Sequence, residues 1–381
     1  MRVLILSCNT GEGHNSCAKA IQEAYHAHGD ICDIEDALRF ISPTVSRFIA
    51  WGHATMYRRF AWLFKWGYSY SEHHPAVFHD DSGIYKLLTS GVDRLYEFIK
   101  LGDYDAVITV HVFTALILTE LLKRHPMEIP TSFVATDYTC SPSTEQSRLD
   151  LYFIPHKSLT YDFECPNIPK EKLVCSGIPI RQVFYQKNDI AEAKRAAGVS
   201  EELPHLLMMC GSMGCGPMKW LVRLLSQEDG FEMTVVCGTN QKLYRKLERR
   251  YAHHPNIHIR GYEKNMPLLM DSADLYLTKP GGLSVTEAYV KELPMICIDA
   301  VAGCEEYNRN FFLRMGAAKT GRNVRQLRDL CLRLLKDRGQ LEEMRETMQR
   351  AGKNNAAETI YQTMSGACAR SKAGSVYAKH G

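Results

Sequence analysis

Three glycine-rich stretches are the parts of this sequence best suited to chemistry, because each follows a short apolar run. Glycine lets backbone N–H groups approach a ligand closely, and a helix that starts at such a turn carries partial positive charge at its N-terminus. The stretches therefore indicate sites for an anion such as a phosphate. They are "NTGEGHN" (residues 9–15), "GSMG" (211–214) and "KPGGLSVTE" (279–287).

Each stretch also has a plainer interpretation as a tight turn between a strand and a helix. In the third stretch, Ser284 and Glu287 have the S-x-x-E spacing of a capping box in the first turn of a helix. The first stretch resembles the start of a dinucleotide-binding fingerprint, but Ser16 stands where the third glycine belongs. Two such openings in one half of the chain, at 211–214 and 279–287, favour the phosphate interpretation.

His14 is the first candidate for a catalytic group, since it follows Gly13 at the expected start of a helix. A histidine in this place can act as a general base, because its pKa is ordinarily near neutrality. The alternative is a surface or capping histidine.

The cysteines and the acidic pair do not indicate a metal site. The thirteen cysteines are scattered without a C-x-x-C pair, and Cys8, Cys210, Cys237 and Cys297 lie within apolar runs. We interpret them as buried thiols of a protein from a reducing cytoplasm. Asp103-Tyr104-Asp105 precedes an expected strand instead of following one, so we expect it to be solvated.

Residues 37–71 contain no Asp or Glu and combine cations with aromatic side chains. Such a composition suits a peripheral helix at the surface of an anionic membrane, while the alternative is an aromatic core. We expect lipid contact through Trp51, Arg58, Arg59, Trp62 and Trp66.

Composition describes an ordinary globular protein. The 381 residues are 45% apolar and 23% charged, and the net charge of +3 is too small to indicate a nucleic-acid partner. Neither a signal peptide nor a membrane span is expected, because no apolar run reaches about 18 residues.

Short apolar runs alternate with helical patterns, which predicts an α/β fold with parallel sheets. We expect one domain at 1–185, a second at 186–345 and a C-terminal part at 346–381. A helical pattern at 341–364 would pack on the first domain, the tail after Gly366 would be disordered, and one helix would begin at Pro217. The expected strands are 3–8, 31–34, 106–110, 131–135, 151–154, 173–175, 206–210, 233–237, 257–259, 275–278 and 295–298.

Four motifs together resemble one family of lipid glycosyltransferases. The G-x-G-H ending at His14, "GSMG", "PGGLSVTEA" and "AGCEEYN" are similar to motifs of monogalactosyldiacylglycerol synthases and processive diacylglycerol glucosyltransferases. The resemblance extends to about residue 365. It implies a GT-B fold, with two Rossmann-like domains facing across a cleft, a UDP-sugar donor on the second domain and diacylglycerol on the first.

The resemblance also implies roles for single residues. Glu287 would bind the ribose, Tyr262 would lie against uracil, and Glu305 and Asn308 keep their places in a motif whose glutamine is replaced by Cys304. In the first domain, Asp137 ends a "TDY" motif and could serve as a base, while Gly13 and His111 would lie near the acceptor. The groups implied for the diphosphate are Gly211, Ser212, Gly214, Gly281, Gly282 and Leu283.

The resemblance thus implies an inverting transfer of galactose or glucose from a UDP-sugar to diacylglycerol, with no metal or other cofactor. The enzyme would be cytoplasmic and peripheral on the inner face of the cell membrane. Alternatives are a UDP-sugar epimerase on the same fold, an NAD-dependent oxidoreductase that uses Asp33 or Glu35, and a lipid-surface binder without enzymatic activity.

Overall fold

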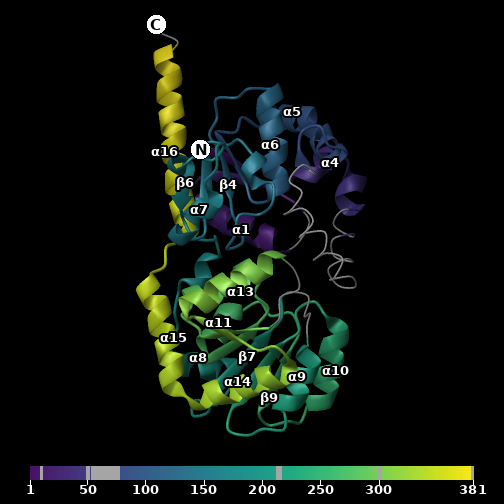
Figure 1. Cartoon of the computed structure of the whole chain (residues 1–381), viewed down its shortest axis with the longest axis vertical. Helices are drawn as coiled ribbons and strands as arrows, with labels where there is room; N and C mark the ends of the chain where they lie inside the picture. The colour runs from purple at the N-terminus through teal and green to yellow at the C-terminus, as the bar shows by residue number, and fades with distance from the viewer. Residues whose placement is uncertain (9–11, 49–51, 53–77, 212–216, 299–302, 379–381) are drawn as a thin grey trace. The chain divides into compact units, whose positions relative to one another are not determined.

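The computed structural model describes residues 1–8, 12–48, 52, 78–211, 217–298 and 303–378, which are coloured in Figure 1. The chain divides into two compact units. The first contains Met1–Gln182, Ala302–Cys304 and Asn354–Gly381, and the second contains Val183–Val301 and Glu305–Lys353. The expected division into an acceptor domain and a donor domain also concerns function, and it stays a prediction.

The first unit is built on a six-stranded sheet in the order β2-β1-β3-β4-β5-β6, in which neighbouring strands are parallel. Every residue of β3 and β4 is buried, as expected for parallel strands covered on both faces. The strands are β1 (Arg2–Ser7), β2 (Ile31–Asp36), β3 (Ala106–Thr109), β4 (Thr131–Val134), β5 (Leu151–Ile154) and β6 (Leu173–Cys175).

Helices follow the strands of this sheet and cover it. Contacts pair α5 with α6 and α1 with α16. The helices are α1 (Glu12–Ala27), α4 (Gly83–Leu88), α5 (Val92–Gly102), α6 (Val112–Arg124), α7 (Thr160–Phe163) and α16 (Ala356–Ala378), and residues 43–48 are also helical. Short 3₁₀ turns are η1 (Ala37–Phe40), η3 (Thr89–Gly91), η4 (Thr144–Gln146), η5 (Lys157–Leu159), η6 (Lys170–Lys172) and η7 (Gln182–Phe184).

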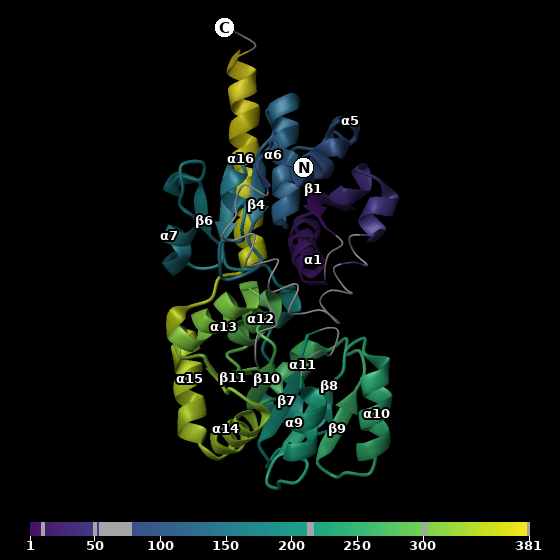
Figure 2. The same cartoon turned by 45° about the vertical axis from the view of Figure 1, so that its right-hand side comes forward.

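The second unit repeats this plan with a parallel sheet in the order β12-β11-β10-β7-β8-β9. Its strands are β7 (His205–Met209), β8 (Glu232–Val236), β9 (Ile257–Arg260), β10 (Leu275–Thr278), β11 (Met295–Cys297) and β12 (Ala318–Thr320). Its helices, labelled in Figure 2 except for α8, are α8 (Ile190–Ala197), α9 (Met218–Leu225), α10 (Gln241–Tyr251), α11 (Met266–Asp271), α12 (Gly282–Val290), α13 (Gly303–Met315), α14 (Val324–Lys336) and α15 (Arg338–Ala351).

The eleven predicted strands are confirmed, each within two residues of its expected bounds. The strand β12 was not predicted, because three residues that include Lys319 give no apolar run. The helix expected to begin at Pro217 begins at Met218, and Pro217 is its N-cap. The buried thiols are confirmed at Cys8, Cys210, Cys237 and Cys297, none of which is in a disulfide.

The C-terminal region differs from the prediction. Two helices, α15 and α16, replace the single expected helix, with Gly352 as the C-cap of the first. The prediction of a disordered tail after Gly366 is wrong as far as Ala378, since α16 continues to that residue. Tertiary contacts hold it: Ser371 Oγ donates to the Glu128 carbonyl at 2.6 Å, and Lys372 Nζ lies 2.7 Å from Asp105.

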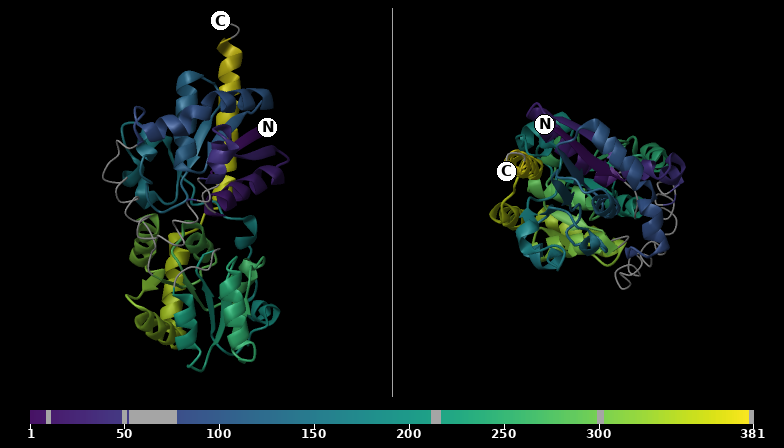
Figure 3. Two further views of the ribbon diagram at one scale, coloured as in Figure 1. Left: turned by 90° about the vertical axis from the view of Figure 1, so that its right-hand side faces the viewer. Right: turned by 90° about the horizontal axis from the view of Figure 1, so that it is seen from above.

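The helix α16 packs on α1 (Figures 1 and 3). The ring of Tyr361 stacks on His28 with 3.9 Å between centroids, and His28 Nε2 lies 3.0 Å from Glu358.

Asp105 differs from the expectation that it is solvated, because its carboxylate pairs with Lys372. Besides Lys372, it accepts a hydrogen bond of 2.7 Å from the backbone N–H of Arg2.

Candidate active site

The carboxyl ends of three neighbouring strands in the first unit bring together candidate catalytic groups. Gly13 and His14 lie in the first turn of α1, which follows β1, while Val110 directly follows β3. The Nδ1 atom of His14 lies 2.9 Å from the carbonyl oxygen of Val110. A carbonyl can only accept, so Nδ1 carries the proton, and Nε2 is the basic nitrogen of the neutral ring.

Two further groups contact this imidazole. The ring of His111 lies edge-on to His14, with 4.5 Å between centroids and 70° between planes. His111 is the N-cap of α6, and its Nδ1 accepts a hydrogen bond of 3.0 Å from the N–H of Phe113. The hydroxyl of Thr136, just beyond β4, lies 3.2 Å from His14 Nδ1.

Asp137 follows Thr136 and is half-buried. The hydroxyl of Thr136 contacts His14, so Asp137 lies at the same end of the sheet. The structure thus brings Gly13, His14 and His111 together beside the strand end that carries Asp137.

A cavity of 640 Å³ lies at the ends of β1 and β2 in the same unit. It is bordered by Asn15, the residue after His14, and by Ser7, whose hydroxyl donates to Asn15 Oδ1 at 2.8 Å. Arg39 and Arg47 also border the cavity. No sequence pattern indicates this cavity, because its lining comes from four separated segments.

In the second unit, the turn between β10 and α12 presents backbone N–H groups at a helix start. Gly281 is the N-cap in an extended conformation, and no side chain of the described residues caps the helix there. No atom of the described residues would lie within 4 Å of a Cβ atom added at Gly281, so these residues leave the space before the helix open. Gly282 and Leu283 form its first turn.

The capping-box interpretation of this turn is wrong. Ser284 lies inside α12 instead of at its N-cap. Glu287, which we expected in the first turn, is the sixth residue of the helix and half-buried. Its charge is close enough to Tyr276 to help raise the pKa of that phenol, although burial is the larger cause.

Lys279 is a residue that the sequence reasoning missed. Its Nζ lies 2.5 Å from Oε1 of Glu305, and both side chains are almost fully buried. A Cβ added at Gly211 would lie 3.5 Å from Lys279 Cε, so Lys279 reaches the turn after β7. The available signal was a cation two residues before the glycine pair, but a single lysine in a loop is not a specific signal.

The structure also describes three other residues that we expected at the donor site. Asn308 is buried, and its side-chain amide donates to the Pro280 carbonyl at 3.1 Å, so it holds the glycine turn in place. Gly211 has a φ of +69°, a conformation that favours glycine. Tyr262 follows β9 and is 65% exposed.

Several expected residues lie outside the described part of the chain. They are Ser212, Gly214, Trp51, Arg58, Arg59, Trp62 and Trp66. Within the described ranges, no group of three or more His, Cys, Asp or Glu side chains is arranged to hold a metal ion. Across the same residues, no helix combines the length and apolar character that a membrane crossing requires.

Comparison with known proteins shows what each part of the chain is similar to. The model of the monogalactosyldiacylglycerol (MGDG) synthase family matches residues 14–180, and that of the glycosyl transferases group 1 matches residues 221–355. A processive diacylglycerol beta-glucosyltransferase of Staphylococcus carnosus is 24% identical over 91% of this chain and 88% of that protein. One of Bacillus licheniformis is 26% identical over 94% and 93%. The first part of the chain is thus similar to the MGDG synthase family, and nearly the whole chain is similar to processive diacylglycerol glucosyltransferases.

Solved structures show that this chain has the GT-B fold. Acinetobacter baumannii MurG matches with a TM-score of 0.64 at 14% identity, over 96% of this chain and 99% of that one. The UDP-GlcNAc 2-epimerase of Neisseria meningitidis matches with a TM-score of 0.59 at 12% identity, over 96% and 99%. Because MurG and the epimerase both match this fold, the fold alone does not decide the reaction.

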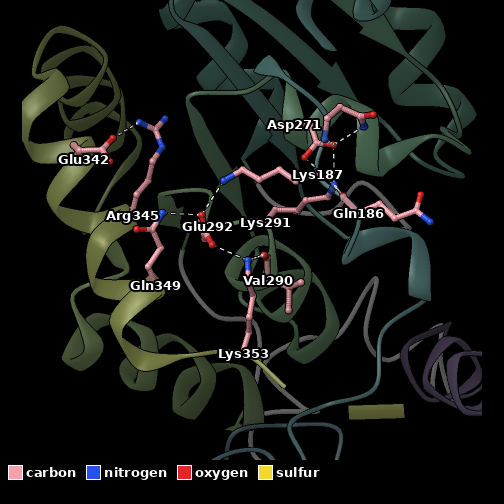
Figure 4. A network of polar contacts seen from close by, with 11 residues as sticks. Gln186, Lys187, Asp271, Val290, Lys291, Glu292, Glu342, Arg345, Gln349 and Lys353 are labelled. Carbon is pink, nitrogen blue, oxygen red and sulfur yellow. Dashed lines mark hydrogen bonds and ion pairs between the residues drawn. The ribbon is translucent and has the colours of Figure 1, made fainter. Parts of the chain in front are cut away.

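In the second unit, a polar network holds the far end of α12 (Figure 4). Lys291 Nζ lies 2.7 Å from Asp271 Oδ1, with both side chains 1% exposed, and it also donates to the Gln186 carbonyl. Glu292 accepts hydrogen bonds from Lys187 at 2.8 Å, Gln349 at 2.9 Å and Lys353 at 2.6 Å.

The network joins the first and last segments of the second unit to the helix that carries the glycine turn. Gln186 and Lys187 lie near the beginning of the second unit, and Lys353 is the last residue of that unit. Glu292 has a φ of +55°, which non-glycine residues rarely adopt, so the surrounding contacts hold a strained backbone. Burial opposes the charge of Glu292, but hydrogen bonds from the two lysines and Gln349 outweigh it and lower its pKa to about 2.

Proposed function

We propose that this protein transfers a hexose from a UDP-sugar to diacylglycerol and so makes a glycolipid. The observation that carries the proposal is the match of the MGDG synthase model to residues 14–180, the part of the chain that holds His14 in a single tautomer. The relatives that match along nearly the whole chain are named processive diacylglycerol beta-glucosyltransferases. Galactose and glucose are the candidate hexoses.

In the proposed mechanism, His14 is the general base. The acceptor hydroxyl must lose a proton as its oxygen attacks the anomeric carbon of the donor. With Nδ1 donating to Val110, Nε2 can take that proton, and the Val110 carbonyl then stabilises the imidazolium that forms. The carboxylate of Asp137, next to Thr136, adds negative charge that favours the protonated ring.

The donor side stabilises the departing UDP. The first turn of α12, with Gly281, Gly282 and Leu283, supplies N–H groups and the positive end of a helix dipole to the diphosphate. Lys279 supplies a full positive charge at the same turn, and Glu305 orients it through their ion pair.

The remaining donor contacts follow the family resemblance. Glu287 accepts hydrogen bonds from the ribose hydroxyls, Tyr262 lies against uracil, and Gly211 with Ser212 and Gly214 borders the diphosphate. These groups supply the needed charge from the chain itself, so we expect donor binding to proceed with divalent metal removed.

The acceptor implies the site of action. Diacylglycerol resides in a bilayer, so the protein would dock from the cytoplasm on the inner face of the cell membrane. Residues 40–70 are the proposed contact, through the cations and tryptophans named above; most of this segment lies outside the described residues.

A panel of radiolabelled UDP-sugars tests the proposal. The protein is incubated with diacylglycerol vesicles and each UDP-sugar, and the lipid and water phases are separated. We expect label from UDP-glucose or UDP-galactose to enter the lipid phase. If the label stays on the nucleotide but the labelled sugar is converted into another sugar, the protein is an epimerase instead.

A further inference from the structure

Two neighbouring helices of the second unit carry a dense group of cations. Lys and Arg number two in α9 and five in α10, against one acid, Glu248. All seven cations are exposed. The whole chain has a net charge of only +3, so positive charge is concentrated here. The cations are Lys219, Arg223, Lys242, Arg245, Lys246, Arg249 and Arg250.

Topology places these helices on one face of the second sheet. The strands β7, β8 and β9 are consecutive in the chain and neighbours in the sheet, so right-handed crossovers put α9 and α10 on the same side (Figure 2). The apolar sides of both helices, including Leu221 and Leu247, pack in the core cluster beneath. Their charged sides therefore form one outward face, which we call the α9–α10 face.

The cations of the α9–α10 face are close together and not neutralised. Lys246 contacts Lys219 and lowers its pKa, and the charges of Arg223 and Arg250 lower it further. Among the described residues, none of the seven forms an ion pair. Many other cations of this unit are paired, as Lys187, Lys291 and Lys353 are in the network of Figure 4. A cluster of like charges without counter-charges points to an external anionic partner.

A tryptophan projects from the same face. Trp220 is 54% exposed, with Lys219 Nζ at 5.3 Å and Arg223 Cζ at 6.0 Å from its ring. Tryptophan with neighbouring cations suits the boundary between lipid headgroups and acyl chains, where the ring is partly apolar and partly wet.

We propose that the α9–α10 face docks on an anionic lipid bilayer, with the cations at the headgroups and Trp220 inserted between them. The choice of a bilayer over another polyanion rests on the proposed function, whose acceptor is a membrane lipid. This surface is distinct from residues 40–70, and it gives the second unit its own contact with the membrane.

Charge reversal with a matched control tests this surface. We compare the parent, Lys219→Glu/Lys246→Glu and a control, Arg325→Glu/Lys336→Glu. The control makes the same charge change at two exposed cations of α14 that form no ion pair with the residues the structure describes. The readout is sedimentation with vesicles that are about one-third phosphatidylglycerol, and with pure phosphatidylcholine vesicles. Thermal unfolding of each variant verifies the fold, and Lys219→Gln/Lys246→Gln is the milder substitute if the reversal is unstable.

The parent should bind the phosphatidylglycerol vesicles at low salt and much less at high salt. Each cation near an anionic surface contributes about fivefold to partitioning, so the α9–α10 reversal should weaken binding about tenfold or more. The α14 control should stay within about twofold of the parent. The single variant Trp220→Ser should also bind the vesicles more weakly than the parent does. Equal sedimentation of both reversed variants and the parent would overturn the proposal.

Turnover on a short-chain diacylglycerol dispersed in detergent separates this proposal from the proposed function. Retained turnover there, with vesicle binding lost in the α9–α10 variant, supports both. A parent that is inactive in detergent but shows the vesicle difference contradicts the transferase assignment and leaves the docking surface intact. A parent that ignores the vesicles but binds a single-stranded oligonucleotide would overturn the lipid assignment.

Discussion

At the scale of single residues, the hydrogen bond from His14 Nδ1 to the Val110 carbonyl decides which ring nitrogen is basic. His14→Ala removes that base, and Asp137→Asn removes the charge that favours its protonated form. We expect each substitution to lower turnover by about two to four orders of magnitude. UDP affinity should be nearly unchanged, because these residues lie in the first unit. Near-normal turnover in both variants would show that another group is the base.

The carboxylate of Glu287 allows a second test at this scale. If it accepts hydrogen bonds from the ribose, Glu287→Ala should weaken UDP binding by about 1.5–3 kcal/mol, the usual contribution of a charge-assisted hydrogen bond. Calorimetry in the presence of EDTA measures the loss. The control is Glu343→Ala, which removes an exposed carboxylate of α15. Equal affinities of parent, variant and control would contradict the ribose assignment.

At the residue level, the sequence placed His14 and His111 correctly just after strands, while their roles stay predictions. His14 and His111 meet because β1 and β3 are neighbours, and parallel strands end at the same edge. The pairing of Lys279 with Glu305 was not predicted, since it joins residues 26 positions apart that no local pattern connects. Asn308 stays a predicted donor residue, and its hydrogen bond to the Pro280 carbonyl was not predicted because it depends on tertiary packing.

At the scale of elements, the strands were predictable because continuous apolar runs mark parallel strands buried on both faces. The helix α16 was predicted only in part. Its last segment, "ACARSKAGSVYA", is small and polar, so its helical state depends on contacts of Cys368, Ser371 and Lys372 with distant backbone and side chains. The capping box failed because α12 begins three residues earlier than the Ser-Glu spacing suggested.

The network at the end of α12 predicts a pH-dependent stability. The pKa of Glu292 is about 2 in the folded protein and near 4.5 when unfolded. Its stabilisation is therefore complete above about pH 5.5 and declines as pH falls through 4.5 toward 2. We expect Glu292→Gln to lower the free energy of unfolding by about 1–3 kcal/mol at pH 7, since its lysine partners are partly exposed.

Urea denaturation of parent and variant at pH 7 and at pH 3 measures this effect. The difference between them should be largest at pH 7 and should narrow at pH 3, where the unfolded carboxyl is protonated. Glu343→Gln serves as the control, because that side chain is exposed on α15. A difference that stays constant or grows on acidification would contradict the assigned role of Glu292.

At the scale of the whole molecule, the uneven distribution of charge matters more than the net value of +3. The acid-free segment at residues 40–70 is the proposed membrane contact of the first unit. Arg58→Glu/Arg59→Glu should weaken sedimentation with anionic vesicles by about 2 kcal/mol or more, at about 1 kcal/mol for each cation. UDP binding should remain intact.

The same variant should lose more activity on bilayer diacylglycerol than on a short-chain acceptor in detergent. Salt should weaken docking of the parent, because the attraction is screened over about 10 Å at 0.1 M. A variant that sediments at low salt as the parent does would show that these arginines do not contact lipid.

The central claim is the transfer of a hexose to the free hydroxyl of diacylglycerol. The most direct measurement is incorporation of radiolabelled glucose or galactose from the UDP-sugar into vesicles that contain diacylglycerol, in EDTA, with triacylglycerol vesicles as the control that lacks the hydroxyl. We predict that label enters the lipid phase with diacylglycerol alone, and that His14→Ala nearly abolishes it. Label that stays in the water phase with both sugars, or that enters both kinds of vesicle equally, would contradict the account.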